Sequence, residues 1–310
     1  MNKQKVIAVA GPTASGKTSL AVFLARELGG EVVSADSMQI YKGMDIATAK
    51  PTIEEMEGIP HHLIGHVDVN EPYNVARYIS EAKECINDIA ARGKVPILAG
   101  GTGLYIDSLL YGVEFFDLPD NTKIRNELKQ RLEIEGAQSL LSELYDIDKE
   151  TAESLHINNI GRIIRALEVY YLTGETMSQM KKRSREKGSE YEPLYICIEF
   201  SDRQKLYDRI DKRVDIMLQN GLLEEARQYI NMGQETTSRQ AIGYKELKPY
   251  FDGSLTLNDA IDNLKKETRH YAKRQLTWFR RNEERFVISP DTDSDFLNTA
   301  LNKAKEFLKG

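Results

Sequence analysis

The sequence predicts an α/β protein with a P-loop NTPase-like core, in which a parallel sheet lies between two layers of helices and carries a helical insertion domain. Three observations predict this fold. Residues 6–28 are typical of a strand, a glycine-rich turn and a helix. Short apolar stretches that end in glycine or polar residues recur later in the chain. Residues 117–191 show helical periodicity without a convincing strand. We therefore expect a core of residues 1–116 and 192–310, with 117–191 as the insertion.

The glycine-rich turn is a phosphate-binding motif. Residues 11–18, GPTASGKT, match G-x-x-x-x-G-K-[ST] at every fixed position. Backbone N–H groups and the dipole at the start of the following helix favour a polyphosphate. Lys17 is expected to add a positive charge, and the Thr18 hydroxyl to ligate Mg²⁺. On the motif alone the ligand would be ATP or GTP. The predicted phosphate-binding residues are Gly11, Thr13, Ala14, Ser15, Gly16, Lys17 and Thr18.

Composition excludes several classes of protein. The 310 residues are 41% hydrophobic and 29% charged, and no apolar run approaches the length of a bilayer span. The N-terminus lacks the pattern of a signal peptide, so a cytoplasmic protein is expected. Cys85 and Cys197 form no C-x-x-C pair, which argues against a disulfide framework or a thiolate metal site. Nothing implies a protein partner, and a monomer is expected.

Net charge limits the expected partners. The formal charge of −6 argues against a general nucleic-acid binder, which usually carries an overall basic field. A local basic surface remains compatible with this charge.

The second predicted strand, residues 31–35, leads to a candidate carboxylate. Gly29 and Gly30 end the preceding helix, and Asp36 follows the strand. Ligands of an open parallel sheet bind beyond the carboxyl ends of its strands, so Asp36 is expected to face the same crevice as the P-loop. The alternative is a turn or helix N-cap aspartate, which is common after a strand.

Residues 41–70 are irregular and contain a histidine cluster. His62 and His66 are four apart, a spacing that two metal ligands on one helix face would have. Pro60 and Gly65 argue against a regular helix there, and no third ligand is near in the sequence. Loop or ligand-lining histidines are therefore expected rather than a metal site.

Residues 73–111 repeat the plan of the N-terminus. A helix is predicted at 73–92 and a buried strand at 94–99, followed by Gly100-Gly101-Thr102-Gly103 and an apolar helix. Two such turns at one sheet edge suggest two halves of one ligand site, with Thr102 as the only non-glycine residue in this turn. Tight packing is the alternative role of these glycines.

The predicted insertion contains basic residues. Arg162 and Arg165 are three apart on one helix face and could both reach a phosphate, although Glu168 continues that face and would also pair with Arg165. The basic run at 181–187 is a solvated linker in the simplest interpretation.

The chain then returns to the core. Residues 194–200 are predicted to form a buried strand, 203–220 a long amphipathic helix and 240–245 a compact turn. Residues 265–281 interleave seven basic residues with three aromatic rings, a pattern that suits an RNA backbone and unstacked bases. A helix whose aromatic side chains face the core is the alternative.

Six segments together resemble the tRNA dimethylallyltransferase family, also called tRNA isopentenyltransferases. They are GPTASGKT at 11–18, DSMQIYKGMDIATAKP at 36–51, GGTGLY at 100–105, RALEVY at 165–170, QAIGYKE at 240–246 and YAKRQLTWFRR at 271–281. The resemblance extends over almost the whole chain in the same order. Its second and third segments are not general P-loop features. This chain departs from the family at 156–159, where HINN replaces the more usual His-Pro-Asn-Asp.

The resemblance implies transfer of a dimethylallyl group from dimethylallyl diphosphate to N6 of the tRNA adenine just 3′ of the anticodon. It implies that the P-loop holds the diphosphate leaving group, whose charge Lys17, Arg162 and Arg165 would stabilise with Mg²⁺. Asp36 would be the general base, and Thr102 would orient the amine. The implied tRNA contacts are Ser37, Met38, Gln39, Gln240, Tyr244, Lys273, Arg274 and Trp278. The basic segments 181–187 and 265–281 would grip the anticodon stem-loop of the tRNA through its phosphates.

Other functions explain fewer of these features. A P-loop kinase of small metabolites would use ATP and Asp36, but gives no role to the basic aromatic C-terminal segment. A GTP-driven switch needs D-x-x-G and N-K-x-D elements, which this sequence lacks. A plain RNA-binding module would have no use for Lys17 and Asp36.

Overall fold

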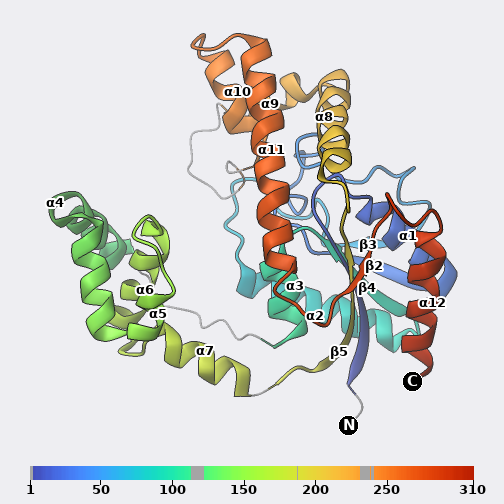
Figure 1. The fold of residues 1–310 in the computed structure, drawn as a ribbon, viewed down its shortest axis with the longest axis horizontal. Coiled ribbons are helices and arrows are strands. Elements are labelled where there is room, and N and C mark those ends of the chain that lie inside the picture. The colour runs from blue at the N-terminus through green and yellow to red at the C-terminus, as the bar shows by residue number, and fades with distance from the viewer. Residues whose placement is uncertain (1–2, 113–121, 187, 231–237, 239–240) are drawn as a thin grey trace. The chain divides into compact units, whose positions relative to one another are not determined.

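The computed structural model describes residues 3–112, 122–186, 188–230, 238 and 241–310 (Figure 1). The chain divides into two compact units, one formed by 1–110 with 190–310 and the other by 111–189. The domain boundary that we predicted at 116/117 lies outside the described residues. The second predicted boundary, at 191/192, falls two residues after the start of the returning segment at Glu190.

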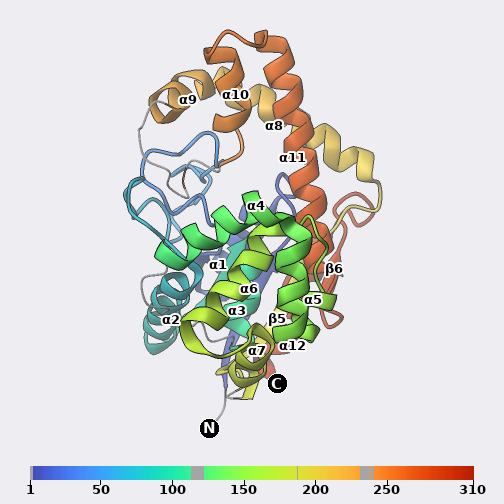
Figure 2. The same cartoon turned by 90° about the vertical axis from the view of Figure 1, so that its left-hand side faces the viewer.

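The second unit consists of helices in the part that the structure describes (Figure 2). They are α4 (Thr122–Ile147), α5 (Lys149–Glu153), α6 (Ile160–Thr173) and α7 (Met177–Glu186). The left-handed Gly136 (φ 81°) interrupts α4, so its two halves can both pack on a small core. That core includes Leu128, Leu140, Leu144, Ile163 and Leu167.

The first unit is built on one parallel sheet. Its strands are β1 (Gln4–Ala10), β2 (Gly30–Ser34), β3 (His61–His62), β4 (Val95–Gly100), β5 (Tyr191–Ile198) and β6 (Phe286–Ile288). They lie in the order β3-β2-β4-β1-β5-β6. The α/β fold predicted from the sequence is confirmed. The edge strands β3 and β6 were not predicted, because runs of two or three residues carry no readable periodicity.

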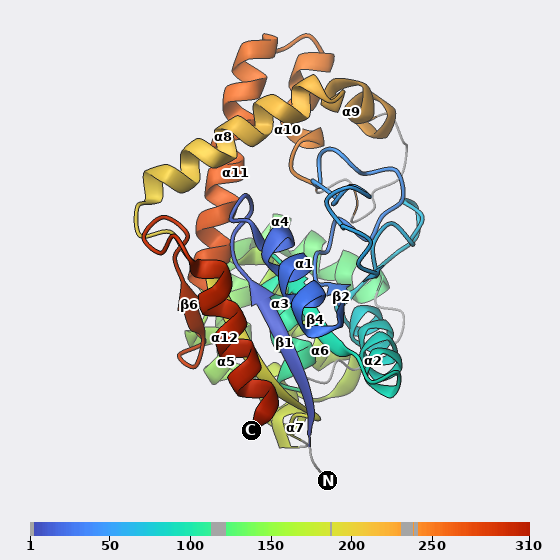
Figure 3. The ribbon, with the colours of Figure 1, turned by 90° about the vertical axis from the view of Figure 1, so that its right-hand side faces the viewer.

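Helices cover both faces of this sheet. Helices α1 (Lys17–Leu28) and α12 (Phe296–Lys309) cover one face, where they pack on Ile7 and Val9 of β1 (Figure 3). Helices α2 (Val75–Ala91) and α3 (Gly103–Leu110) pack on Val6 and Ala8. Successive side chains of a strand point to opposite faces, so the continuous apolar run of β1 supplies both cores.

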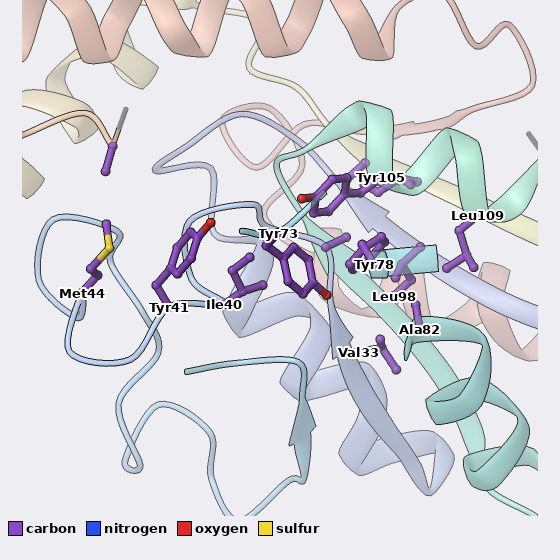
Figure 4. Close-up of a cluster of buried hydrophobic side chains, with 14 of the residues drawn as sticks. Val33, Ile40, Tyr41, Met44, Tyr73, Tyr78, Ala82, Leu98, Tyr105 and Leu109 are labelled. Carbon is purple, nitrogen blue, oxygen red and sulfur yellow. The ribbon is translucent and has the colours of Figure 1, made fainter. Parts of the chain in front are cut away.

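The core under α2 and α3 also holds the irregular segment that follows β2 (Figure 4). Ile40, Tyr41 and Met44 are fully buried. Tyr78 of α2 stacks on Tyr105 of α3 with ring centroids 4.1 Å apart. The burial of these side chains fixes the chain immediately after Asp36, although it has almost no regular secondary structure.

Four further helices of this unit lie at the end where the strands finish (Figures 1 and 3). They are α8 (Arg203–Gln219), α9 (Leu222–Ile230), α10 (Tyr244–Phe251) and α11 (Leu257–Phe279). Ion pairs of Lys265 with Asp215 and of Arg269 with Asp211, both 2.6 Å long, join α11 to α8. None of the described helices has the length and apolar character that crossing a membrane requires.

Candidate active site

Three strand ends bring the predicted phosphate and carboxylate elements together. In the register of the sheet, Ala10 of β1 lies beside Gly100 of β4, and Ser34 of β2 lies beside Ala99. A Cβ atom at Gly100 would lie 2.1 Å from the carbonyl oxygen of Ala35, so only glycine allows this approach. The P-loop, Asp36 and the turn at 101–103 therefore meet at one sheet edge.

The P-loop has the backbone that anion binding requires. Ala14 (φ 62°) and Gly16 (φ 96°) are left-handed, and helix α1 begins at Lys17. The first N–H groups of a helix have no intrahelical acceptor. Those of α1 therefore supply donors and a positive dipole end beside the cavity that Gly16, Lys17 and Thr18 line.

That cavity has a volume of about 1520 Å³, and all the residues that line it belong to the first unit. Its wall includes residues 13–19 of the P-loop, residues 36–39 after β2 and residues 45–50. Helices α8 and α11 complete it with a polar group of side chains: Arg209, Arg213, Thr268, Tyr271, Arg274 and Gln275.

Cations concentrate around the P-loop. The Lys17 Nζ donates to the carbonyl oxygen of Pro12 at 2.7 Å. Burial, together with the nearby Arg213 guanidinium, lowers the pKa of Lys17 to about 8, although Asp36 acts in the opposite direction. Burial also lowers the pKa of Arg213. An entering polyanion would relieve this crowding of positive charge.

Asp36 holds the turn after β2 and still lines the cavity. Its Oδ1 accepts hydrogen bonds from the backbone N–H groups of Met38 at 2.9 Å and Gln39 at 3.3 Å. Asp36 therefore does have the turn role that was the alternative in the sequence analysis. This role uses Oδ1 and leaves Oδ2 available as an acceptor in the cavity. Thr102 lies next to this turn, where its Oγ1 accepts from the Ser37 backbone N–H at 2.9 Å. The predicted positions of Asp36 and Thr102 at one site agree with this geometry.

The segment at 45–50, whose role in the site was not anticipated, is tied to the helices. Glu225 of α9 accepts hydrogen bonds, each 2.8 Å long, from the backbone N–H groups of Asp45, Ile46 and Ala47. The Gln39 amide donates to the carbonyl oxygens of residues 48 and 49 at 3.1 and 3.0 Å. One wall of the cavity therefore depends on a carboxylate far away in the sequence.

Helix α8 supplies two arginines that sequence reasoning missed. The Arg209 Nε donates to the carbonyl oxygen of Ala14 at 2.8 Å, and Arg213 reaches the Thr13 hydroxyl at 3.4 Å. They are four residues apart, so they lie on one helix face. A search for basic pairs beside the apolar stripe of residues 203–220 would have found them.

Helix α11 supplies Tyr271 and Gln275, which were also missed as individual residues. Burial raises the pKa of the Tyr271 hydroxyl, and Asp36 contributes in the same direction. Gln275 is 5% exposed and hydrogen-bonds to both glycine-rich turns. The sequence signal for them was their spacing of four residues, which places both on one face of a helix that is otherwise basic.

The side chains predicted to bind tRNA have different environments. Lys273 and Arg274 are exposed on α11, with no described carboxylate in ion-pair contact. Trp278 donates from Nε1 to Asp107 at 2.5 Å and lies against Gly103, so it docks α11 on α3. Arg281 lies over the Trp278 ring at 5.0 Å.

Tyr244, another predicted tRNA contact, is the first residue of α10. Gln240 lies outside the described residues. Tyr244 is buried and donates its hydroxyl to Glu225 at 2.9 Å, which gives it a packing role. Contact of Tyr244 with RNA stays a prediction.

Of the two predicted anion-binding arginines of the second unit, Arg165 is held by a buried carboxylate and Arg162 is not. Arg165 donates to Glu168 Oε2 at 2.9 Å, as considered from the sequence, and Arg125 donates to the same atom at 2.9 Å. Glu168 is fully buried. Arg162 is exposed. Their contact with a diphosphate stays a prediction.

Two of the three histidines in residues 41–70 contact carboxylates, and His61 contacts the carbonyl oxygen of Ile59. His62 Nε2 lies 2.8 Å from Glu31, and His66 Nε2 lies 2.9 Å from Glu81. Among the described residues, no group of three histidine, cysteine, aspartate or glutamate side chains is placed to hold a metal ion.

The cavity offers few oxygen donors for Mg²⁺, so a bound phosphate ligand would have to supply the others. Thr18 and Asp36 line it with hard oxygen donors, whereas a cage made by protein side chains is not present in the described part. Mg²⁺ usually keeps several waters and is bound through few protein groups together with substrate phosphates. The residues present therefore suit a metal that arrives with a diphosphate.

The sequence matches the model of one protein family, described as IPP transferase, over residues 39–282. The chain belongs to the IPP transferase family. The chain is similar to a tRNA dimethylallyltransferase of Bacillus subtilis, with 47% identity over 297 residues that cover 94% of both chains. A tRNA dimethylallyltransferase of Thermoanaerobacter sp. (strain X514) is 48% identical over 279 residues, which cover 89% of both chains.

Solved structures of IPP transferases have the same fold. The full-length tRNA isopentenylpyrophosphate transferase of Bacillus halodurans superimposes with a TM-score of 0.72 at 42% identity, covering 99% of this chain and 96% of that one. A eukaryotic dimethylallyltransferase acting on tRNA gives a TM-score of 0.82 at 32% identity, covering 99% of this chain and 80% of that one. The IPP transferase fold therefore extends over the whole of this chain.

Proposed function

We propose that this IPP transferase is a tRNA dimethylallyltransferase, which transfers the dimethylallyl group of dimethylallyl diphosphate to N6 of the adenine 3′-adjacent to the anticodon. One observation carries the proposal. One cavity is lined by the P-loop, by the carboxylate Asp36 and by Arg274 of α11, a helix on which Lys273 is also exposed. The kinase alternative explains the P-loop and Asp36, but it is not favoured because the related proteins are named as tRNA dimethylallyltransferases.

The P-loop would bind the diphosphate as a leaving group. The N–H groups at the start of α1 would donate to its oxygens, and Lys17 would exchange its contact with Pro12 for a phosphate oxygen. Arg209 and Arg213 would add positive charge on the side of α8. Negative charge grows on the diphosphate as its C–O bond breaks, so these donors stabilise the transition state more than the ground state.

The acceptor amine would be activated at Asp36. As the adenine N6 forms its bond to C1 of the dimethylallyl group, N6 gains positive charge and its proton must leave. Asp36 Oδ2 would take that proton, while Thr102 and Tyr271 would help to orient the amine. The adenine must be unstacked from the anticodon loop to enter, at a cost of a few kcal/mol.

Mg²⁺ would be held by the Thr18 hydroxyl together with oxygens of the diphosphate. When bound, the ion would neutralise part of the charge on the leaving group. Lys17 and the N–H groups of α1 would orient the diphosphate independently of the ion. The proposal includes tRNA as the partner, dimethylallyl diphosphate as the donor, a cytoplasmic location and a monomeric state.

Nucleoside mass spectrometry tests the activity. The protein is incubated with unmodified tRNA and either dimethylallyl diphosphate or ATP, and the tRNA is then digested to nucleosides. A prenylated adenosine formed with dimethylallyl diphosphate alone is expected. A phosphorylated product that requires ATP would favour the kinase instead.

A further inference from the structure

The amide of Gln275 lies between the two glycine-rich turns of the site. Its Oε1 accepts the backbone N–H of Thr13 in the P-loop at 2.8 Å. Its Nε2 donates to the carbonyl oxygen of Gly101 at 2.9 Å. The side chain is 5% exposed, so water does not substitute freely for either contact.

Only an amide side chain of this length satisfies both contacts. The Thr13 N–H can only donate and the Gly101 carbonyl can only accept, so the two partners fix the orientation of the amide. A carboxylate would lack the donor, and a thioether would lack both strong groups. Gly101 is also matched to this side chain, because a Cβ atom there would lie 2.3 Å from Gln275 Nε2 and 3.8 Å from Asp36 Oδ2.

The contact with Thr13 determines which P-loop amides remain for a ligand. The Thr13 N–H is committed to Gln275, and the Ser15 N–H donates to Pro12 at 3.3 Å. The N–H groups at the start of α1 then remain as the anion donors. By holding the P-loop at Thr13, Gln275 would also set the direction in which the N–H groups of α1 point.

Gln275 also connects the phosphate site to the acceptor site. Tyr271, one helical turn earlier on α11, lies near Asp36 and Thr102. The carbonyl that Gln275 binds precedes Thr102 in the chain. One buried amide therefore spans from the loop that would hold the leaving group to the turn that would orient the acceptor.

We propose that Gln275 is a positioning residue, which holds the P-loop in its diphosphate-binding geometry by bridging Thr13 and Gly101. This inference rests on the proposed function for the identity of the diphosphate. It goes beyond that function in assigning to Gln275 a role that acts through the backbone of the P-loop.

Gln275→Met tests the proposal, because methionine keeps a similar volume but makes neither hydrogen bond. The affinity for inorganic pyrophosphate is measured by calorimetry, and the KM for the donor and the tRNA affinity are measured separately. The dissociation constant for pyrophosphate and the donor KM should both rise about ten-fold. The dissociation constant for tRNA alone should change less than about two-fold. Gln228→Met is the matched control, since Gln228 is exposed on α9 and should behave like the wild type.

Hydrogen exchange of the wild-type protein provides a readout that does not depend on a variant. The Thr13 amide should be protected in the ligand-free protein, and Gln275→Met should remove this protection. Rapid exchange of the wild-type Thr13 amide would overturn the proposal even if the variant failed to fold. An unchanged pyrophosphate affinity in a folded variant would also overturn it, as would an equal loss of tRNA affinity, which would indicate general loosening of α11.

Pyrophosphate binding and exchange do not require prenyl transfer. If the wild type binds pyrophosphate but prenylates no tRNA, the proposed function fails and the role of Gln275 is still tested.

Discussion

At the scale of single residues, Asp36 has two tasks on its two oxygens. Oδ1 closes the turn after β2 by accepting two backbone N–H groups, and Oδ2 remains for the proposed proton transfer. A substitution that removes the whole side chain would disturb both tasks. A substitution that keeps an oxygen at the Oδ1 position separates them.

Asp36→Asn should preserve the turn and remove the base. We expect kcat for prenyl transfer to fall by roughly 10²- to 10⁴-fold, because an amide cannot accept the proton, while pyrophosphate affinity stays close to that of the wild type. Single-turnover kinetics with saturating donor and tRNA measure the loss. Wild-type turnover would remove Asp36 from the base role. Asp36→Ala serves as comparison and should in addition lower the melting temperature.

The same residue shows how far the sequence alone could predict the site. The P-loop and the strand before Asp36 could be predicted because a fixed motif and an apolar run are local features of the sequence. Their proximity could be predicted because the carboxyl ends of parallel strands lie at the same edge of a sheet. The bond between Thr13 and Gln275 joins residues 262 apart, and no local pattern reports such a contact. The sequence could show that the two arginines of α8 share one helix face, but nothing in it indicated that this face lies beside the P-loop.

At the scale of elements, α9 supports a segment that has almost no regular structure of its own. Residues 45–47 direct three N–H groups at the buried Glu225, which also receives the Tyr244 hydroxyl. Buried backbone N–H groups without hydrogen-bond partners are costly. The Glu225 carboxylate therefore supplies the acceptors that the backbone carbonyls of a neighbouring strand would otherwise provide. The cavity wall is thus formed by a loop whose position depends on a helix.

Glu225→Ala should therefore destabilise the protein and loosen this wall. The free energy of unfolding should fall by about 2 kcal/mol, because the N–H groups of residues 45–47 lose their acceptor. Urea denaturation followed by circular dichroism measures it. Glu224→Ala is the matched control on the same turn of α9, where the side chain is exposed. Equal stabilities of the two variants would contradict the anchoring role.

At the scale of the whole molecule, an acidic protein is proposed to bind a polyanion. The net charge of −6 coexists with a local basic surface, because carboxylates of α8 neutralise Lys265 and Arg269 but not Lys273 and Arg274. Lys266, in the first half of α11, is likewise exposed with no described carboxylate in ion-pair contact, so the predicted RNA contact of residues 265–281 is not confined to one half of the helix. Trp278 contributes by docking that helix on α3.

Salt dependence tests this division of charge. Each phosphate contact that Lys273 or Arg274 makes releases counterions, so tRNA affinity should fall steeply with salt concentration. Replacing both residues with alanine should make the slope of log affinity against log salt shallower by about 2. Filter binding across a salt series measures the slope. The control Lys305→Ala, on the exposed side of α12, should leave the slope unchanged. A wild-type affinity that is insensitive to salt would contradict an electrostatic grip.

The most direct measurement of the central claim, that the P-loop holds a leaving diphosphate, follows the tRNA reaction with dimethylallyl diphosphate without any nucleotide. Prenylated adenosine is counted by mass spectrometry and released pyrophosphate by an enzymatic assay. We predict one pyrophosphate for each prenylated adenosine, with Lys17→Ala raising the donor KM. Failure to form prenylated adenosine unless ATP is present and cleaved would contradict the claim.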